Sequence, residues 1–442
     1  MGRRSLEDRR RRAGQSSFVP MLNTVASFFS LYLATLLLLL GTGLFNTYLG
    51  LRLTADHVSE LWVGGLIAVY YLGLVLGARS GHKLIMQVGH IRAYVAGAAI
   101  VTTMVLAQAL LDNLWLWLLF RFIVGVSMVT QFMVIESWLN EQTENHQRGR
   151  VFAFYMVVSG LGTVLGQLSL TLFPRLNYEP LVFAAICSVL GLVPVALTRR
   201  LHPAVPMPAP IMIRYYLKRV PMSLLVVFIA GNLTGAFYGL APVFAVKQGL
   251  SSDQVAWFLA AAVAAGLVAQ WPLGQLSDHV NRVGLVRFNA ALLALVGIPL
   301  WGWWVLPFWA LIAISCAFGA LQFPLYPIGT AFANDNVDPD RRVGLSAIVI
   351  MAYGLGAGLG PFVAGALMRY IDTDMFFIFV SGSAFLLVLL IRPQRVTGEY
   401  LSEDAPTQFV PMSEPQASPA VSALDPRVDP QTDVSAEPVP QE

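Results

Sequence analysis

Ionisable side chains are scarce within the apolar segments of this 442-residue chain, and those few are the residues that could do chemistry. Arg121 is the one basic residue well inside such a segment, seven residues after Leu114. Its planar guanidinium suits a carboxylate or a phosphate. Alternatively, the side chain extends along its helix to reach polar headgroups. The first interpretation predicts a site that binds a neutral or anionic solute and rejects permanent cations.

Uncharged polar side chains occur in several of the same apolar segments. If these segments cross a membrane, a buried arginine costs at least about 2.5 kcal/mol unless it meets polar partners or water. We therefore expect polar residues or the solute itself to compensate Arg121. Each polar residue could instead form a hydrogen bond between helices, worth about 0.6 kcal/mol, and we expect fewer than half to touch the solute. The candidates for a substrate cavity are Asn46, Tyr70, Arg121, Gln131, Asn232, Tyr238, Gln270, Gln322 and Tyr326.

Carboxylates avoid the apolar segments almost completely. Among the 25 acidic residues, only Glu136 falls inside one, in the segment that begins at Leu114. At about 1.5 Å per residue, Glu136 lies about 33 Å along a helix that starts there, at its end. Glu136 is either an interfacial residue that faces water beside Trp138 or a residue for gating or proton coupling. Because the chain has no cluster of nucleophile, metal ligands or acid–base pair, we expect no enzyme, no catalytic residue, no metal and no cofactor.

Composition identifies the class of protein that these residues belong to. Apolar residues make up 56% of the chain and charged residues 12%, with a mean hydropathy of +0.65. A soluble domain carries about 25% charged residues, so a membrane protein is expected. Twelve apolar stretches are long enough to span a bilayer: 22–49, 61–80, 93–111, 114–137, 150–173, 180–198, 221–246, 254–276, 285–305, 308–333, 343–368 and 375–391.

Charge and proline divide the chain further. Counting Lys and Arg at the ends of the twelve stretches gives 22 on the side of the N-terminus and four on the other. Positive residues resist translocation, so both termini are expected in the cytoplasm. The expected domains are a basic N-terminus (1–21), an N-terminal six-helix bundle (22–198), a proline-rich cytoplasmic linker (199–220), a C-terminal six-helix bundle (221–392) and a disordered acidic tail (393–442).

The two halves repeat one another. With a constant shift of 192, Gly43 aligns with Gly235 without a gap. With a shift of 194, Arg148 aligns with Arg342 and Gly125 with Gly319. The same shift places the string GLGTVLGQ at 160–167 over GLGAGLGP at 354–361. These matches indicate that the two six-helix halves are duplicates.

Several motifs are similar to those of the major facilitator superfamily (MFS), whose members consist of two such halves. The superfamily loop motif G-x-L-x-D-x-x-G-R resembles GQLSDHVNR at 274–282, where Asn281 replaces the second glycine. The pattern R-x-x-x-G occurs at Arg121 and Gly125. The antiporter motif G-x-x-x-G-P is incomplete in the fifth helix and complete only in the eleventh. LFNTYL (44–49), VIESW (134–138), RGRVFAFYM (148–156) and AQWPLGQLSD (269–278) resemble the bacterial YcaD-like branch.

The resemblance implies an all-α membrane protein with twelve transmembrane helices in two pseudo-symmetric six-helix bundles, the MFS fold. It implies a monomeric, multi-pass protein of the bacterial inner membrane that moves a small organic solute by secondary active transport and alternating access, with proton coupling and efflux as open alternatives. A transport-inactive receptor or sensor and an uncoupled facilitator are the rival interpretations. Its partners are then the lipid bilayer, the solute and, if coupled, protons, but no nucleic acid.

The resemblance also assigns roles to charged and small residues. Asp278 and Arg282 are either part of a solvated loop or, paired across the two halves, a latch at one gate. The glycines of the fifth and eleventh helices either pack helices tightly or let the halves rock against each other. Gating or coupling candidates are Glu136, Gly274, Asp278, Arg282, Arg148 and Arg342, and the packing glycines are Gly162, Gly166, Gly356 and Gly360.

The asymmetry of basic residues makes a topological prediction. Reporters fused after Arg395 or within 199–220 should both report the cytoplasm, whereas a reporter at Asp112 should report the opposite side, because positive residues are concentrated on one side of the twelve stretches. A cytoplasmic signal at Asp112 would contradict the twelve-helix topology.

Overall fold

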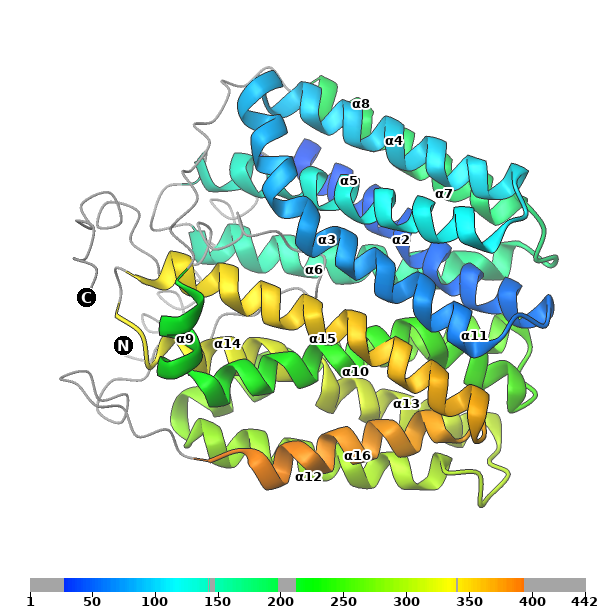
Figure 1. The fold of residues 1–442 in the computed structure, drawn as a ribbon, viewed down its shortest axis with the longest axis vertical. Coiled ribbons are helices and arrows are strands. Elements are labelled where there is room, and N and C mark those ends of the chain that lie inside the picture. The colour runs from blue at the N-terminus through cyan, green and yellow to red at the C-terminus, as the bar shows by residue number, and fades with distance from the viewer. Residues whose placement is uncertain (1–27, 142, 144–147, 198–211, 339–340, 393–442) are drawn as a thin grey trace, which may run out of the picture.

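The computed structural model describes residues 28–141, 143, 148–197, 212–338 and 341–392, and the regular structure in these ranges is entirely helical. The N-terminal residues, most of the linker and the acidic tail lie outside the described residues, so the five domain boundaries stay predictions. We call the end where α8 stops and α9 starts the linker end, and the opposite one the far end. Figure 1 shows the spanning helices running between these two ends.

The helices form two bundles, each of six apolar segments. The first bundle contains α2 (Phe29–Ala55), α3 (Glu60–Val88), α4 (His90–Leu110), α5 (Leu114–Glu141), α6 (Arg148–Ser169) with the 3₁₀ turn η2 (Leu170–Leu172), α7 (Glu179–Leu190) and α8 (Leu192–Ala196). After α9 (Ile213–Arg219), the second bundle contains α10 (Pro221–Lys247), α11 (Ser252–His279), α12 (Arg282–Gly297) with η3 (Ile298–Leu300), α13 (Phe308–Gln322), α14 (Leu325–Asn334), α15 (Arg342–Tyr370) and α16 (Met375–Leu390).

Each of the twelve expected apolar stretches contains at least one helix in the described residues. Within the described residues, eleven spans are long and apolar enough to cross a membrane, and α16 is a shorter apolar helix of 16 residues. Two spans consist of paired helices, α7 with α8 and α13 with α14. The expected helix ends differ most from the structure at α3, which runs to Val88 rather than to 80, at α12, which ends at Gly297 rather than at 305, and at α2, which runs to Ala55 rather than to 49. Charged residues end an apolar stretch but not a helix, so α2 and α3 extend past the apolar run.

The sequence repeat is reproduced in the contacts between helices. Gly43 of α2 packs against the backbone of Thr163 in α6, and the aligned Gly235 of α10 packs against Ala357 in α15. In each case an added Cβ would overlap the neighbouring backbone. The glycine therefore allows the close approach between helices that small residues permit in a membrane. The two bundles therefore use the same contacts at equivalent positions.

The four predicted packing glycines all contact a helix of their own bundle. Gly162 and Gly166 of α6 lie against Leu36 and Leu40 of α2. The equivalent Gly356 and Gly360 of α15 lie against Phe228 and Asn232 of α10. These contacts agree with tight packing within each bundle, and a role of the four glycines in rocking of the two halves stays a prediction.

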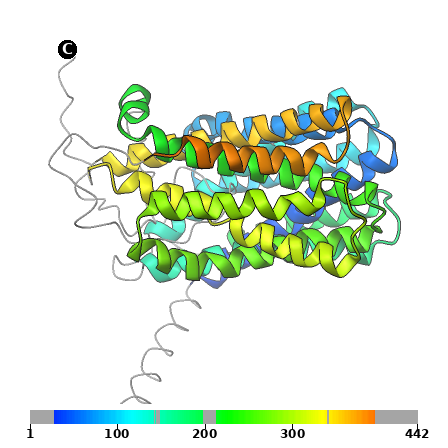
Figure 2. The ribbon, with the colours of Figure 1, turned by 90° about the horizontal axis from the view of Figure 1, so that it is seen from below.

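Other glycines of the same helices contact the opposite bundle. Gly160 of α6 lies against Leu267 of α11, and its repeat equivalent Gly354 of α15 lies against Val75 of α3. Gly64 of α3 contacts the carbonyl of Pro361, a proline inside α15. The contact between α3 and α15 thus runs from the far end to the middle of both helices. Figure 2 shows both bundles from a second direction.

The glycine contacts make a prediction about stability. Gly356→Ala should destabilise the protein by about 1–3 kcal/mol, because the added methyl meets the backbone of α10 and neither helix can yield freely. Gly382→Ala in α16 is the matched control, since no atom lies within 4 Å of its added Cβ. Thermal unfolding of purified protein in detergent, followed by tryptophan fluorescence, compares them. Equal melting temperatures for both variants would contradict the packing role.

Candidate functional site

Arg121 is completely buried, two turns into α5 from the far end. Its Nη2 donates a hydrogen bond to Oδ1 of Asn46 in α2 at 2.9 Å. Its guanidinium lies over the Tyr70 ring of α3 at 4.5 Å and over the Phe45 ring of α2 at 4.9 Å. The alternative in which Arg121 reaches the headgroups is therefore wrong. Three of the predicted cavity residues, from three helices, meet at one point.

The R-x-x-x-G pattern explains how this centre forms. Gly125 lies one turn after Arg121, and its Cα faces the carbonyl of Tyr70 so closely that a Cβ would overlap it. Because residues four apart share a face of a helix, the glycine that admits α3 also brings the Tyr70 ring under the guanidinium. Phe45 was not predicted from the sequence, although it is the neighbour of Asn46.

Arg121 retains unused donors. A guanidinium has five N–H groups, and within the described residues its Nε and Nη1 have no hydrogen-bond partner. The Tyr70 hydroxyl is likewise without a partner there. A buried donor without a partner is costly. Arg121 can therefore donate hydrogen bonds to an oxygen atom of a ligand bound beside it.

The remaining polar candidates of the cavity serve mostly as contacts between helices. Gln131 packs against Gly97 of α4, inside the first bundle, and its Nε2 contacts Met128 Sδ at 3.8 Å. Gln322 of α13 donates to the hydroxyl of Thr234 in α10. Asn232 lies against Gly360, and within the described residues its Oδ1 has no partner. Gln270 is buried in α11.

Aromatic rings dominate the equivalent region of the second bundle. Tyr238, the repeat equivalent of Asn46, stacks on Phe323 with 6.2 Å between ring centroids. Tyr326 of α14 meets Tyr353 of α15 edge to face at 4.7 Å. The second bundle therefore offers rings where the first offers Arg121 and an amide.

Glu136 is fully buried near the linker end of α5, so its interpretation as a residue that faces water is wrong. Its Oε1 accepts a hydrogen bond from the Tyr155 hydroxyl of α6 at 3.1 Å. The neighbouring Trp138 is also fully buried and stacks on the ring of His90, with 6.2 Å between centroids. Glu136 remains a candidate for coupling or gating.

The charged residues of the 274–282 motif join helices of the second bundle. Arg282 pairs with Asp278 at 3.1 Å and with Asp335, which follows α14. Gly274 is buried in the last turns of α11. Asn281 caps α12 by accepting hydrogen bonds from the backbone N–H groups of Val283 and Gly284. The cap explains why asparagine is tolerated where the motif has glycine.

Those two ion pairs lie within one bundle, and the expected latch across the two halves stays a prediction. The partner Asp335 was not predicted, because 53 residues separate it from Arg282. Arg148 and Arg342, the other two gating candidates, are the first residues of α6 and α15. Their equivalent places confirm the alignment at a shift of 194, and their role stays a prediction.

An ion pair that the sequence did not reveal connects the two bundles at the far end. Lys247, the last residue of α10, pairs with Glu60, the first residue of α3, whose side chain is 9% exposed. Lys247 also donates to the Thr373 hydroxyl at 2.9 Å. Gly365 of α15 packs against the carbonyl of Glu60. The far end is thus closed by contacts between the bundles.

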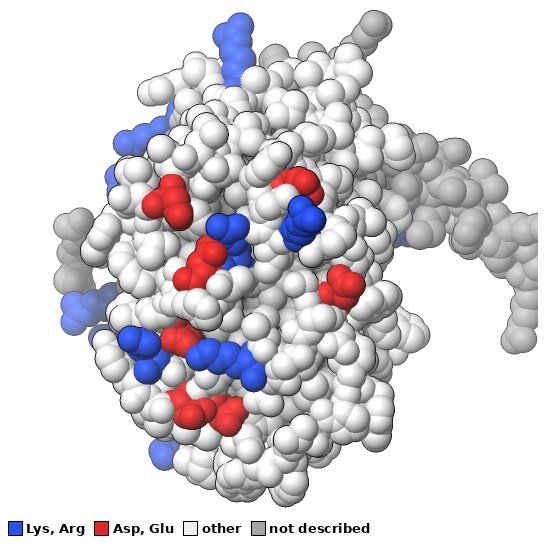
Figure 3. All heavy atoms as spheres, turned by 90° about the vertical axis from the view of Figure 1, so that its right-hand side faces the viewer, with Lys and Arg blue, Asp and Glu red and all other residues white. Residues whose placement is uncertain are grey.

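Further polar contacts surround this pair. Gln248 donates to Oδ1 of Asp374 at 2.9 Å. Partial burial raises the pKa of Asp374 and the neighbouring Asp372 carboxylate adds to the effect, while the bond from Gln248 acts in the opposite direction. Figure 3 views this end, where acidic and basic side chains lie close together over the middle of the face.

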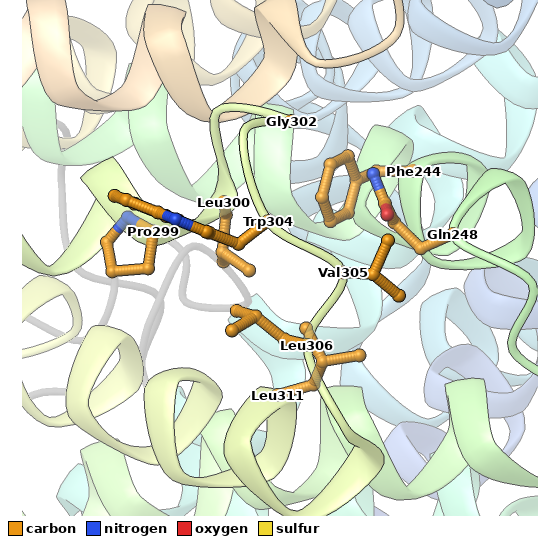
Figure 4. A pocket seen from close by; sticks show the side chains of 9 residues that line it. All are labelled: Phe244, Gln248, Pro299, Leu300, Gly302, Trp304, Val305, Leu306 and Leu311. Atoms are coloured by element: carbon orange, nitrogen blue, oxygen red, sulfur yellow. The ribbon is translucent and has the colours of Figure 1, made fainter.

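A small pocket at the same end lies within the second bundle rather than between the bundles (Figure 4). Phe244 of α10 and Gln248, which follows α10, line it, with Trp304 and Leu306 of the loop after η3 and Leu311 of α13. Apart from Gln248, its side chains are apolar, and the Gln248 amide is bound to Asp374. None of the predicted cavity residues lines this pocket.

Comparison with known proteins identifies the family. A model of the Major Facilitator Superfamily matches residues 31–340 and 300–424. The chain belongs to the major facilitator superfamily. It is 30% identical over 367 residues to the uncharacterized MFS-type transporter YcaD of Escherichia fergusonii, with 82% of this chain and 94% of the relative covered.

Solved MFS structures share the fold. The nucleoside transporter NupG superposes with a TM-score of 0.71 at 12% identity, covering 82% of this chain and 98% of that chain. A bacterial homolog of the human lysosomal transporter Spinster, in an inward-facing and unoccupied conformation, gives 0.64 at 14% identity, covering 83% and 94%. These likenesses confirm the MFS fold. The chain is accordingly a multi-pass membrane protein of a transporter family rather than an enzyme, with the bilayer and a small-molecule substrate as its partners.

The ion pair at the far end makes a prediction. Lys247→Ala should favour separation of the bundles there by about 1 kcal/mol, the upper range for a partly exposed ion pair. The reason is that Glu60 loses the cation that offsets its burial, while Lys247 itself is partly exposed. Pulsed EPR distances between spin labels at residues 112 and 253, one in each bundle, should gain a longer component.

Two further variants control this experiment. Arg52→Ala removes a cation that pairs within the first bundle, with Asp56, and should leave the distances unchanged. The exchanged pair Glu60→Lys with Lys247→Glu should restore the original distribution. If Lys247→Ala and Arg52→Ala give the same distances, the pair does not hold the far end closed.

Proposed function

We propose that this chain is a secondary active transporter that moves a small neutral or anionic organic solute by alternating access, with Arg121 at the centre of its binding site. The observation that carries the proposal is the fully buried guanidinium of Arg121 with two nitrogens that have no partner among the described residues. A solute carboxylate or other oxygen completes its hydrogen bonding, and its planar fork favours such groups over cations.

Contacts between the bundles support a position for this site between the two halves. Gly50 of α2 packs against Pro242 of α10. Asn46 and Tyr238 each lie four residues back from these two positions, about 6 Å nearer the linker end. Because residues four apart share a helix face, Asn46 and Tyr238 face the space between α2 and α10 at one level. The solute then meets the Asn46 and Arg121 pair on one side and the Tyr238 ring on the other.

This two-sided site restricts the solute further. Arg121 and Asn46 offer N–H groups to an oxygen-rich end, whereas Tyr238, stacked on Phe323, offers the face of a ring to an apolar or planar body. Alternating access requires the contacts at the far end to separate, including the Glu60–Lys247 pair. We assign proton coupling to Glu136, the buried carboxylate nearer the linker end of the helix that carries Arg121.

The proposal is tested with protein in vesicles, against a panel of organic anions, neutral solutes and a cationic dye such as ethidium, with and without an imposed pH gradient. Arg121→Ala should lower transport of the accepted solute about 10- to 150-fold, the equivalent of one charged hydrogen bond. Arg121→Lys should keep a weakened activity, because it retains the charge without the fork. Asn46→Ala should give an intermediate loss and covers the case in which Arg121→Ala does not fold.

Arg369→Ala is the matched control, since it removes an exposed arginine at the far end of α15. Robust transport of ethidium that is indifferent to Arg121→Ala would refute the proposed site. Binding of a solute without flux in any direction would favour the receptor interpretation. Transport that Glu136→Gln and the pH gradient leave unchanged would make the protein an uncoupled facilitator.

A further inference from the structure

The short helix α9 has two exposed faces of different chemistry. Ile213 and Leu217 are 44% and 55% exposed and, four residues apart, lie on the same side of the helix. Arg214 and Lys218 are exposed on the adjacent side with the same spacing. A helix that presents apolar side chains beside basic ones is suited to the boundary between lipid tails and headgroups.

The opposite side of α9 is fixed to the second bundle. The buried Tyr216 donates from its hydroxyl to the carbonyl of Arg341 at 2.9 Å. Nε of Arg219 donates to the carbonyl of Asn336 at 3.0 Å. The guanidinium of Arg341 lies over the Tyr215 ring at 4.6 Å. These contacts hold α9 against the ends of α14 and α15, so its exposed faces point away from them.

The position of α9 matches the depth of the headgroups. It ends two residues before α10, whose 27 residues extend about 40 Å against a hydrocarbon core of about 30 Å. In Figure 1, α9 runs across the direction of the spanning helices, and in Figure 2 it is seen end-on at the edge of the bundle. The helix therefore lies parallel to the membrane plane where α10 leaves the lipid tails.

We propose that α9 binds anionic phospholipid at the linker end: Ile213 and Leu217 enter the interface, and Arg214 and Lys218 bind the lipid phosphates. The charges of Arg214 and Lys218 complement a phosphate surface. A second copy of the chain does not fit as the occupant, because two apolar side chains expose far less than the roughly 800 Å² per partner of a stable interface. This inference does not depend on the transported solute.

The insertion of Leu217 is measured on the full chain. Leu217→Cys in a Cys316→Ser background is labelled with an environment-sensitive fluorophore, while Cys187 is buried. In vesicles of two parts phosphatidylcholine to one part phosphatidylglycerol, the emission should shift to the blue and iodide quenching should fall several-fold relative to the same label at Asp112→Cys. Water-like emission with equal quenching at both sites would overturn the proposal. A shift that appears only at high protein-to-lipid ratio would assign the face to a second copy instead.

The charged face is tested by titrating phosphatidylglycerol and measuring bound lipid by native mass spectrometry. Arg214→Gln with Lys218→Gln should weaken retention about fivefold per removed charge. The control, Arg175→Gln with Arg369→Gln, removes two exposed charges from the far end and should retain lipid like the wild type. Equal retention by both double variants would overturn the role of α9, whatever the outcome of the transport measurements.

Discussion

Close backbone contact at glycine is the interaction on which the arrangement of both bundles depends. Lipid tails are as apolar as leucine side chains, so helices in a bilayer gain little from simply hiding apolar surface. In this chain the gain comes from packing where a missing Cβ lets two helices touch, as between α2 and α6 at Gly43 and between α10 and α15 at Gly235. Because the two contacts are equivalent, each bundle builds the same framework from its own half of the sequence.

The polar centre at Arg121 depends on the same close packing of helices at glycine. Gly125 admits α3 to α5, and the same approach places the Tyr70 ring against Arg121. At the equivalent place in the second bundle, Gly319 meets Ala262 of α11, and no charge accompanies it. One scaffold therefore carries a charge in one half and aromatic rings in the other. In the proposed site, such a difference suits a solute whose two ends are chemically unlike.

Much of the fold could be predicted from the sequence, because apolar length and the repeat are local or periodic properties. Arg121, Asn46 and Tyr70 were grouped correctly since a buried charge must find polar partners. The direction in which Gln131 points could not be predicted, because residues 127–139 of α5 are all buried and the sequence of the helix is apolar on nearly every side. The burial of Glu136 could not be predicted for the same reason. The Glu60–Lys247 pair joins residues 187 positions apart, and nothing in the local pattern relates them.

The helices α15 and α6 occupy equivalent places in the two bundles, and they differ in stiffness at one position. Pro361 lies inside α15 and has no backbone N–H, so the Ala357 carbonyl one turn before it has no helical donor. Gly235 lies directly against that same oxygen, in place of a bulkier side chain. The repeat equivalent in α6 is Gln167, which keeps its N–H. Curvature can therefore change at a lower energetic cost in α15 than in α6, and because α15 also contacts α3, a bend there is transmitted to the first bundle.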